Sequence, residues 1–126
     1  MFVNGRPVYL NLLKIRWPLP ALVSGLHRIS GVVLFLAIPV GLLLLDQSLA
    51  NPEGFSAVKG LLAHPFLKLI LAGMIWALCH HLFAGMRFFL MDLDLFMERS
   101  QARRSAALAA AAGGLSALIL IVRLLS

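Results

Sequence analysis

The chain has 126 residues, of which 61% are hydrophobic and only 13% are charged. A soluble domain of this length has too little interior to bury so much apolar surface, and intrinsically disordered chains are poor in apolar residues. The net charge of +6 comes from 11 Lys and Arg residues scattered along the chain, which argues against nucleic-acid binding. The lone Cys79 excludes a disulfide framework within the chain. These totals predict a protein whose solvent is lipid.

The N-terminal segment up to Trp17 contains Arg6, Lys14 and Arg16, but no long apolar stretch that ends in a small-residue cleavage site. It is therefore not predicted to be a cleaved signal peptide, and its composition does not match an organelle transit segment. We expect a bacterial chain or one that is already processed. The two prolines at positions 18 and 20 delay a regular helix until about Ala21.

Three charge-free runs determine the predicted architecture. They cover residues 29–45, 69–86 and 105–122 and are 17, 18 and 18 residues long. As helices they measure about 26 Å each, close to the ~30 Å hydrocarbon core of a bilayer. We predict an all-α membrane protein, a single transmembrane anchor domain over residues 1–126 with helices at about 21–49, 65–92 and 104–125. The alternative, a soluble three-helix bundle, requires polar stripes that these runs lack.

The distribution of basic residues predicts the orientation of the helices. Eight Lys and Arg residues precede or open the first run or flank the connection between the second and third helices, and three lie on the other side. The N-terminus and that connection should therefore face the cytoplasm, with the C-terminus on the outer side. The residues from Asn51 to Gly54 are interpreted as a turn in the outer loop. Small residues in the third run, Ala106–Gly114, predict close approach of a neighbouring helix.

Ionisable side chains inside a span are energetically costly, so His80 and His81 are the first candidates for a functional site. Three of the four residues on the helix face of His81 are small, the set being Ala77, Leu78, Ala84 and Gly85. Such a shallow wall suits a flat haem whose iron is bound by the imidazole. His80 points about 100° away, toward the bulky Trp76 and Phe83, so His81 is preferred as the iron ligand. The alternative is an imidazole that only hydrogen-bonds a neighbouring helix.

His27 lies beside Arg28 at the margin of the first run. We expect it roughly 10 Å shallower in the membrane than His81. That difference in height would prevent both residues from binding one iron, so a second histidine ligand is expected from another polypeptide. His27 is instead expected near the haem propionates, and the alternative is a solvated interfacial histidine.

Ser24 and Arg28 are spaced i and i+4 and share a helix face at the start of the first span. A hydroxyl and a guanidinium can hold a quinone carbonyl and stabilise the negative charge that reduction places on it. The alternative is an Arg that extends to the headgroups and a Ser bonded to its own helix. Arg87 and Asp92, near the end of the second span, suggest an ion pair or a docking point for soluble subunits. The chain carries no phosphate loop, nucleophile–base pair or paired intramembrane carboxylates, so independent turnover of a soluble substrate is not expected.

Two ordered motifs resemble signatures of the succinate dehydrogenase cytochrome b subunit family. The first is Arg6-Pro7 followed by Ser24-Gly25-Leu26-His27-Arg28-Ile29-Ser30, and the second is His81, three residues, Gly85, any residue and Arg87, followed by apolar residues and Asp92. The three-helix layout, the length and the loop Asn51–Phe55 are similar too. The sequence departs from relatives at His80, where bacterial members often carry Tyr, and at Phe88, where some carry His.

The resemblance implies one of two membrane anchors of respiratory complex II. His81 would be an axial ligand of haem b, and a second anchor subunit would provide the other ligand. Ser24 and Arg28 would line a ubiquinone site beside the iron–sulfur subunit, which receives electrons from the flavoprotein subunit. His27, together with Arg28, would lie near the propionates.

The resemblance also implies a multi-pass protein of the bacterial inner membrane that takes part in electron transport and the tricarboxylic acid cycle. The chain would be a subunit of succinate dehydrogenase (quinone), an oxidoreductase, and not the subunit that carries the catalytic flavin. Two alternatives remain open: a haem-free structural anchor, and an anchor of a quinol:fumarate reductase.

Overall fold

The computed structural model describes residues 2–3, 6–7, 14 and 16–126, and the prediction that residues 1–17 are not a cleaved signal peptide lies largely outside them. The described elements are a short antiparallel hairpin followed by helices. Their bounds are β1 (Phe2–Val3), β2 (Arg6–Pro7), α1 (Leu19–Ala50), α2 (Pro52–Ala63), α3 (Pro65–Asp92) and α4 (Arg99–Leu125).

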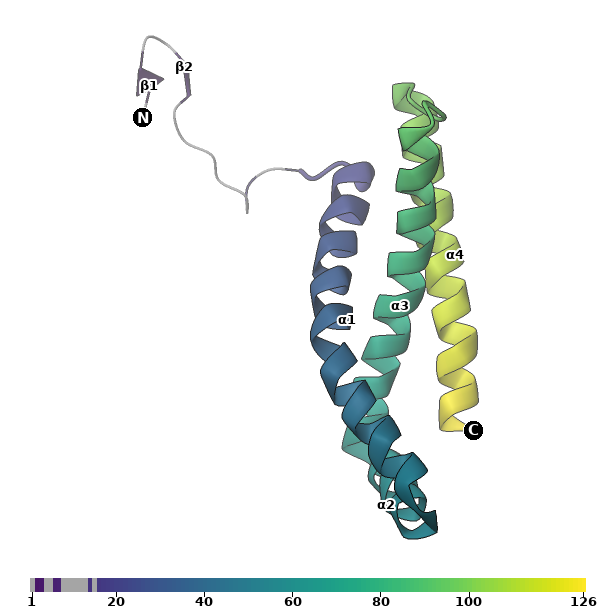
Figure 1. Cartoon of the computed structure of the whole chain (residues 1–126). Coiled ribbons are helices and arrows are strands. Elements are labelled where there is room, and N and C mark those ends of the chain that lie inside the picture. Colours follow the sequence, from purple (N-terminus) through teal and green to yellow (C-terminus); the bar gives the residue numbers. More distant parts are fainter. Residues whose placement is uncertain (1, 4–5, 8–13, 15) are drawn as a thin grey trace.

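Of the three long helices, α3 runs antiparallel to both α1 and α4 and packs against both of them (Figure 1). The start of α1 and the α3–α4 connection therefore lie at one end of the molecule, whereas α2 and the C-terminus lie toward the other (Figure 1). This order is the one expected for three successive spans. Which end faces the cytoplasm stays a prediction.

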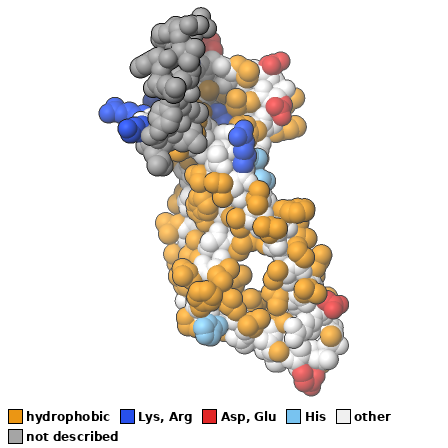
Figure 2. All heavy atoms as spheres, turned by 90° about the vertical axis from the view of Figure 1, so that its left-hand side faces the viewer, with side chains coloured by type: hydrophobic (Ala, Val, Ile, Leu, Met, Phe, Trp, Pro, Cys, Tyr) orange, Lys and Arg blue, Asp and Glu red, His pale blue; other side chains and the backbone are white. Residues whose placement is uncertain are grey.

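Each of these three helices is long and apolar enough to cross a membrane. Their lengths of 32, 28 and 27 residues correspond to about 48, 42 and 40 Å, so all exceed the ~30 Å hydrocarbon core. Large apolar side chains are exposed along each of them, and they cover most of the face seen in Figure 2. In water such a surface would drive aggregation, so this arrangement fits lipid and does not fit a soluble bundle.

The predicted turn at Asn51–Gly54 is wrong, because these residues begin helix α2. The Asn51 side chain caps the helix by accepting a hydrogen bond from the backbone N–H of Gly54 at 2.7 Å. Pro52 occupies the first helical position, where its missing N–H costs nothing. Asn and Pro favour both turns and helix starts, and here the apolar residues that follow decide in favour of a helix.

Small residues form the contact between α3 and α4, as the third run predicted. Every buried residue of α4 is small, namely Ala106, Ala109, Gly113 and Ala117. The backbones approach closely at Gly113, where an added Cβ atom would lie 3.2 Å from Cα of His80. This close approach fixes α4 against the part of α3 that carries the two histidines.

Replacing Gly113 with Leu is expected to destabilise the protein by about 1–3 kcal/mol, because the side chain would force the two backbones apart. Gly114 is the matched control, since a Cβ atom there would meet nothing within 4 Å. Thermal denaturation of the detergent-solubilised protein should show a lower midpoint for Gly113→Leu only. Equal midpoints for the two variants would contradict the close contact.

Candidate functional site

The orientation of His81 is set by α1. Its Nδ1 lies 3.0 Å from the backbone carbonyl oxygen of His27 and 3.2 Å from Oγ of Ser30. Ser30 is buried and its hydroxyl donates to the same His27 carbonyl at 2.9 Å. A carbonyl oxygen can only accept, so this contact assigns the proton to Nδ1 and leaves the lone pair of the ring on Nε2. An imidazole held in this way has the tautomer that a metal ligand needs.

His27 does not lie at a different height from His81. The two rings are stacked, with centroids 4.1 Å apart and planes inclined by 7°, so the expected separation of roughly 10 Å is wrong. Arg28 is not the edge of the span, because α1 begins at Leu19 and places His27 eight residues inside the helix. In α3, His81 is eleven residues from the end at Asp92, so the two histidines lie at similar distances from the same end of the bundle.

Two glycines make room for the stacked rings. A Cβ atom at Gly31 would lie 2.9 Å from Cε1 of His81, closer than side chains tolerate, and a Cβ atom at Gly85 would lie 3.3 Å from Nε2 of His27. Gly85 therefore accommodates His27, and Ala84 packs against Val23 and Ala106. Ala84 is buried in this cluster, so this residue of the predicted wall serves helix packing. The role of the wall in haem binding stays a prediction.

His80 occupies a different environment. It is buried, its ring stacks on Trp76 with centroids 5.3 Å apart, and its Nε2 lies 3.4 Å from the carbonyl oxygen of Val23. The predicted contact with Trp76 is confirmed. These contacts are those of a packing residue, and they distinguish His80 from its neighbour, whose ring lies against His27.

Ser24 and Arg28 lie one turn apart near the start of α1, and in sequence they flank His27, one of the two stacked histidines. Ser24 is half-buried and Arg28 is exposed. In the part of the chain that the structure describes, no hydrogen bond joins these two side chains, and Arg28 forms no ion pair. Both polar groups therefore remain available at the end of the bundle that carries the α3–α4 connection.

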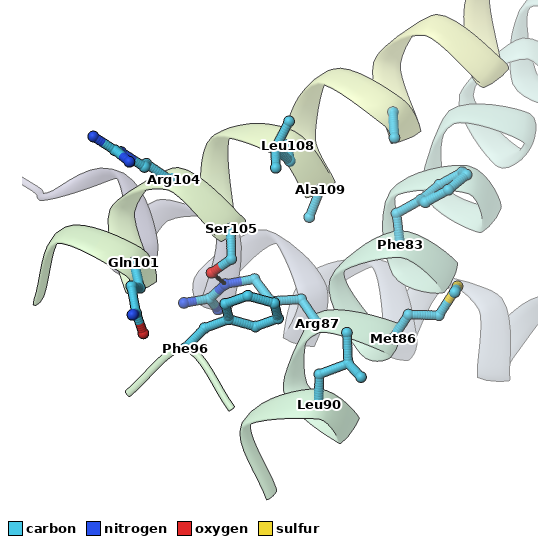
Figure 3. A pocket seen from close by; sticks show the side chains of 11 residues that line it. Phe83, Met86, Arg87, Leu90, Phe96, Gln101, Arg104, Ser105, Leu108 and Ala109 are labelled. Carbon is cyan, nitrogen blue, oxygen red and sulfur yellow. Dashed lines mark hydrogen bonds between the residues drawn. The ribbon is translucent and has the colours of Figure 1, made fainter. Parts of the chain in front are cut away.

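Arg87 does not pair with Asp92, so the ion-pair interpretation is wrong. It reaches across to α4, where its Nε donates to Oγ of Ser105 at 3.0 Å (Figure 3). An Nη group of Arg87 also donates to the carbonyl oxygen of Ala102 at 3.3 Å. Its guanidinium also lies 5.2 Å from the centroid of the Phe88 ring. Arg87 is thus a buried link between the two helices.

Sequence reasoning missed Ser30 and Gly31 as parts of the site. Both act across the α1–α3 contact, so only a known helix crossing relates them to His81. The one available signal was the position of Ser30 at the end of the first motif, three residues after His27.

Comparison with known proteins identifies the family. Residues 3–122 match the family model described as "Succinate dehydrogenase/Fumarate reductase transmembrane subunit". The chain belongs to this family. The match includes α1, α3 and most of α4, and therefore both histidine-bearing segments. It confirms the resemblance drawn from the two motifs.

Among curated relatives, the succinate dehydrogenase cytochrome b556 subunit of Coxiella burnetii (strain RSA 493 / Nine Mile phase I) is 42% identical over 102 residues, which cover 80% of this chain and 82% of that protein. The succinate dehydrogenase cytochrome b556 subunit of Paracoccus denitrificans is 34% identical over 120 residues, covering 94% of this chain and 92% of that protein. As a succinate dehydrogenase/fumarate reductase transmembrane subunit, the chain is a membrane component of an oxidoreductase complex. Both relatives are named as subunits of succinate dehydrogenase, so they are parts of a larger complex.

Proposed function

We propose that this chain is a haem b- and quinone-binding anchor subunit of succinate dehydrogenase, with His81 as an axial ligand of the haem iron. The observation that carries the proposal is the hydrogen bond from Nδ1 of His81 to the His27 carbonyl at 3.0 Å, which leaves Nε2 as the ligating atom. Both relatives described above are named cytochrome b556 subunits. When bound, the haem supplies a one-electron redox centre.

The residues around His81 fit a haem group. An imidazole that donates from Nδ1 to a backbone carbonyl is oriented and made more basic as a ligand. His27 faces the flat side of the His81 ring, and two imidazoles stacked in this way are not placed on opposite sides of one iron. We therefore propose that a second anchor subunit provides the other ligand, and that His27 and Arg28 lie near the anionic propionates.

The quinone site is proposed at Ser24 and Arg28. The hydroxyl of Ser24 donates a hydrogen bond to one quinone carbonyl oxygen, and the guanidinium of Arg28 stabilises the negative charge that reduction places on that oxygen. Arg28 has no acidic partner in the described part of the chain, so its charge is available for this task. The electrons come from the iron–sulfur subunit, which receives them from the flavoprotein subunit.

The proposed orientation places the start of α1 and the α3–α4 connection on the cytoplasmic side of a bacterial inner membrane. On the face drawn in Figure 2, the visible Lys and Arg side chains lie toward one end, and most of the face below them is apolar. Eight Lys and Arg residues belong to this end and three to the other. Such an asymmetry is typical of cytoplasmic ends. The iron–sulfur and flavoprotein subunits would dock at this end, beside Ser24 and Arg28.

A reduced-minus-oxidised absorption spectrum of the purified assembly tests the haem assignment. Sharp b-type bands are expected, with a haem content that follows the amount of this chain. The absence of these bands from the assembly would mean that the chain is a haem-free structural anchor. The family name covers fumarate reductases as well, and succinate dehydrogenase is favoured by the names of both relatives.

Replacing Arg28 with Leu is expected to lower the rate of quinone reduction by about tenfold or more, because a charge-assisted hydrogen bond is lost. Haem content should change much less, and Arg28→Lys should restore part of the rate. Steady-state kinetics with a soluble ubiquinone analogue gives the rate, and the visible spectrum gives the haem content. Unchanged quinone kinetics in Arg28→Leu would remove this residue from the site.

A further inference from the structure

We propose that the groove between α3 and α4 binds one anionic phospholipid. The groove has a volume of about 520 Å³ and is formed by one face of each helix together with Phe96 from their connection. Figure 3 shows its two unlike ends: Gln101 and Arg104 lie at one, and Phe83 and Met86 lie at the other. It contains no residue of α1, so it is separate from the haem and quinone sites proposed above.

The polar end carries positive charge without a negative partner. Arg87 is only 5% exposed, and its hydrogen-bond acceptors are the neutral Ser105 hydroxyl and Ala102 carbonyl. Arg104 lies on the rim and is exposed. Among residues 16–126, neither guanidinium forms an ion pair with an acidic side chain. A buried cation with neutral partners only is costly, and an anion at the mouth of the groove would lower that cost.

The depth of this charge matches the phosphate region of a bilayer. Arg87 lies five residues before the end of α3, and Arg104 lies five residues after the start of α4, so both are about 7.5 Å from their helix ends. Helices of about 40 Å extend some 5–6 Å beyond a ~30 Å hydrocarbon core at each side. Both Cα atoms therefore lie just inside the boundary of the core, and an arginine side chain reaches the headgroups from there.

The rest of the groove suits an acyl chain. Beyond the arginines its lining is apolar, with Phe83 and Met86 on α3 and Leu108 and Ala112 on α4. It extends along the helices, the direction in which lipid chains lie. Basic pockets between transmembrane helices are sites for anionic headgroups, and a zwitterionic choline headgroup would place its own cation beside the arginines. The charge therefore selects an anionic phospholipid over a neutral one.

Native mass spectrometry of the detergent-solubilised assembly containing the full chain tests the headgroup. The assembly is titrated with phosphatidylglycerol or with phosphatidylcholine carrying the same acyl chains. We expect one tightly retained phosphatidylglycerol per chain, which Arg104→Gln weakens by about fivefold. The matched control is Arg103→Gln, since Arg103 is exposed but does not line the groove. Equal retention of phosphatidylcholine, or equal weakening by the two variants, would overturn the proposal.

A second pair of variants tests the acyl part without touching any charge. Ala112→Phe should fill the groove and reduce the retained phosphatidylglycerol, whereas Ala111→Phe should not, because Ala111 is exposed and lies outside the lining. Unchanged retention in Ala112→Phe would contradict the assignment. Efficient cross-linking of Leu108→Cys to another subunit would also overturn it, because the groove would then be covered by protein.

Discussion

Replacing His81 with Ala is expected to abolish haem binding while the chain remains folded in the membrane. The substitution removes the proposed iron ligand. It leaves no buried polar group unpaired, because the His27 carbonyl keeps its hydrogen bond from the Ser30 hydroxyl at 2.9 Å. The haem content per chain, measured by visible spectroscopy on the purified assembly, should fall by about tenfold or more, as expected when a first-coordination ligand is lost. Retention of this chain in the membrane fraction shows that the fold survives.

His80→Ala is the matched control, since the two histidines are adjacent and only one is a proposed ligand. His80 is buried against Trp76 and Val23, so its loss should lower stability by about 1–3 kcal/mol and leave the haem content nearly unchanged. Equal loss of haem from both variants would defeat the assignment of His81. Such a result would mean that haem depends on the general packing of α3.

Replacing Gly31 with Ala is expected to disturb the haem almost as strongly as the loss of the ligand itself. The added methyl group would lie 2.9 Å from Cε1 of His81, so the ring must turn or α1 must move away from α3. Either change weakens the hydrogen bond from Nδ1 of His81 to the His27 carbonyl, which orients the proposed ligand. Overpacking of this kind costs about 1–3 kcal/mol. The expected result is a lower haem content and a shifted midpoint potential of the haem that remains.

Gly41→Ala gives the matched control for this variant. It makes the same chemical change in the same helix, at a position where a Cβ atom meets nothing within 4 Å. Its haem spectrum and potential should equal those of the wild type, and the helix itself should gain slightly in stability. A Gly31→Ala protein with normal haem and normal potential would show that the close contact with His81 is not maintained in the assembly.

The three long helices were predictable because their signal is local. Charge-free runs of 17 or 18 residues can satisfy their backbone groups in lipid only as helices. The observed helices extend past these runs because charged residues such as Arg28 and Arg87 lie inside them. Helix α2 was missed because Asn51 and Pro52 favour a turn as much as a helix start.

The site was predictable only in part, because its contacts join residues far apart in the sequence. The preference for His81 over His80 came from helix periodicity alone. The hydrogen bond of His81 to α1 joins residues 54 positions apart, and that of Arg87 to Ser105 joins residues 18 positions apart. Contacts over such separations cannot be recognised from the periodic pattern of a single helix. The height of His27 was misjudged because depth was counted from the nearest charge and not from the helix end.

The carbonyl of His27 connects the proposed haem ligand, His81, to the backbone of a different helix. Ser24 and Arg28 flank His27 within about one turn of α1, so the proposed quinone-binding groups and the acceptor for Nδ1 of His81 belong to one rigid segment. A rotation or tilt of that segment on occupancy by quinone would alter the direction of the imidazole, and with it the electronic tuning of the metal. Haem potential and quinone occupancy would then be thermodynamically linked, each reporting on the other.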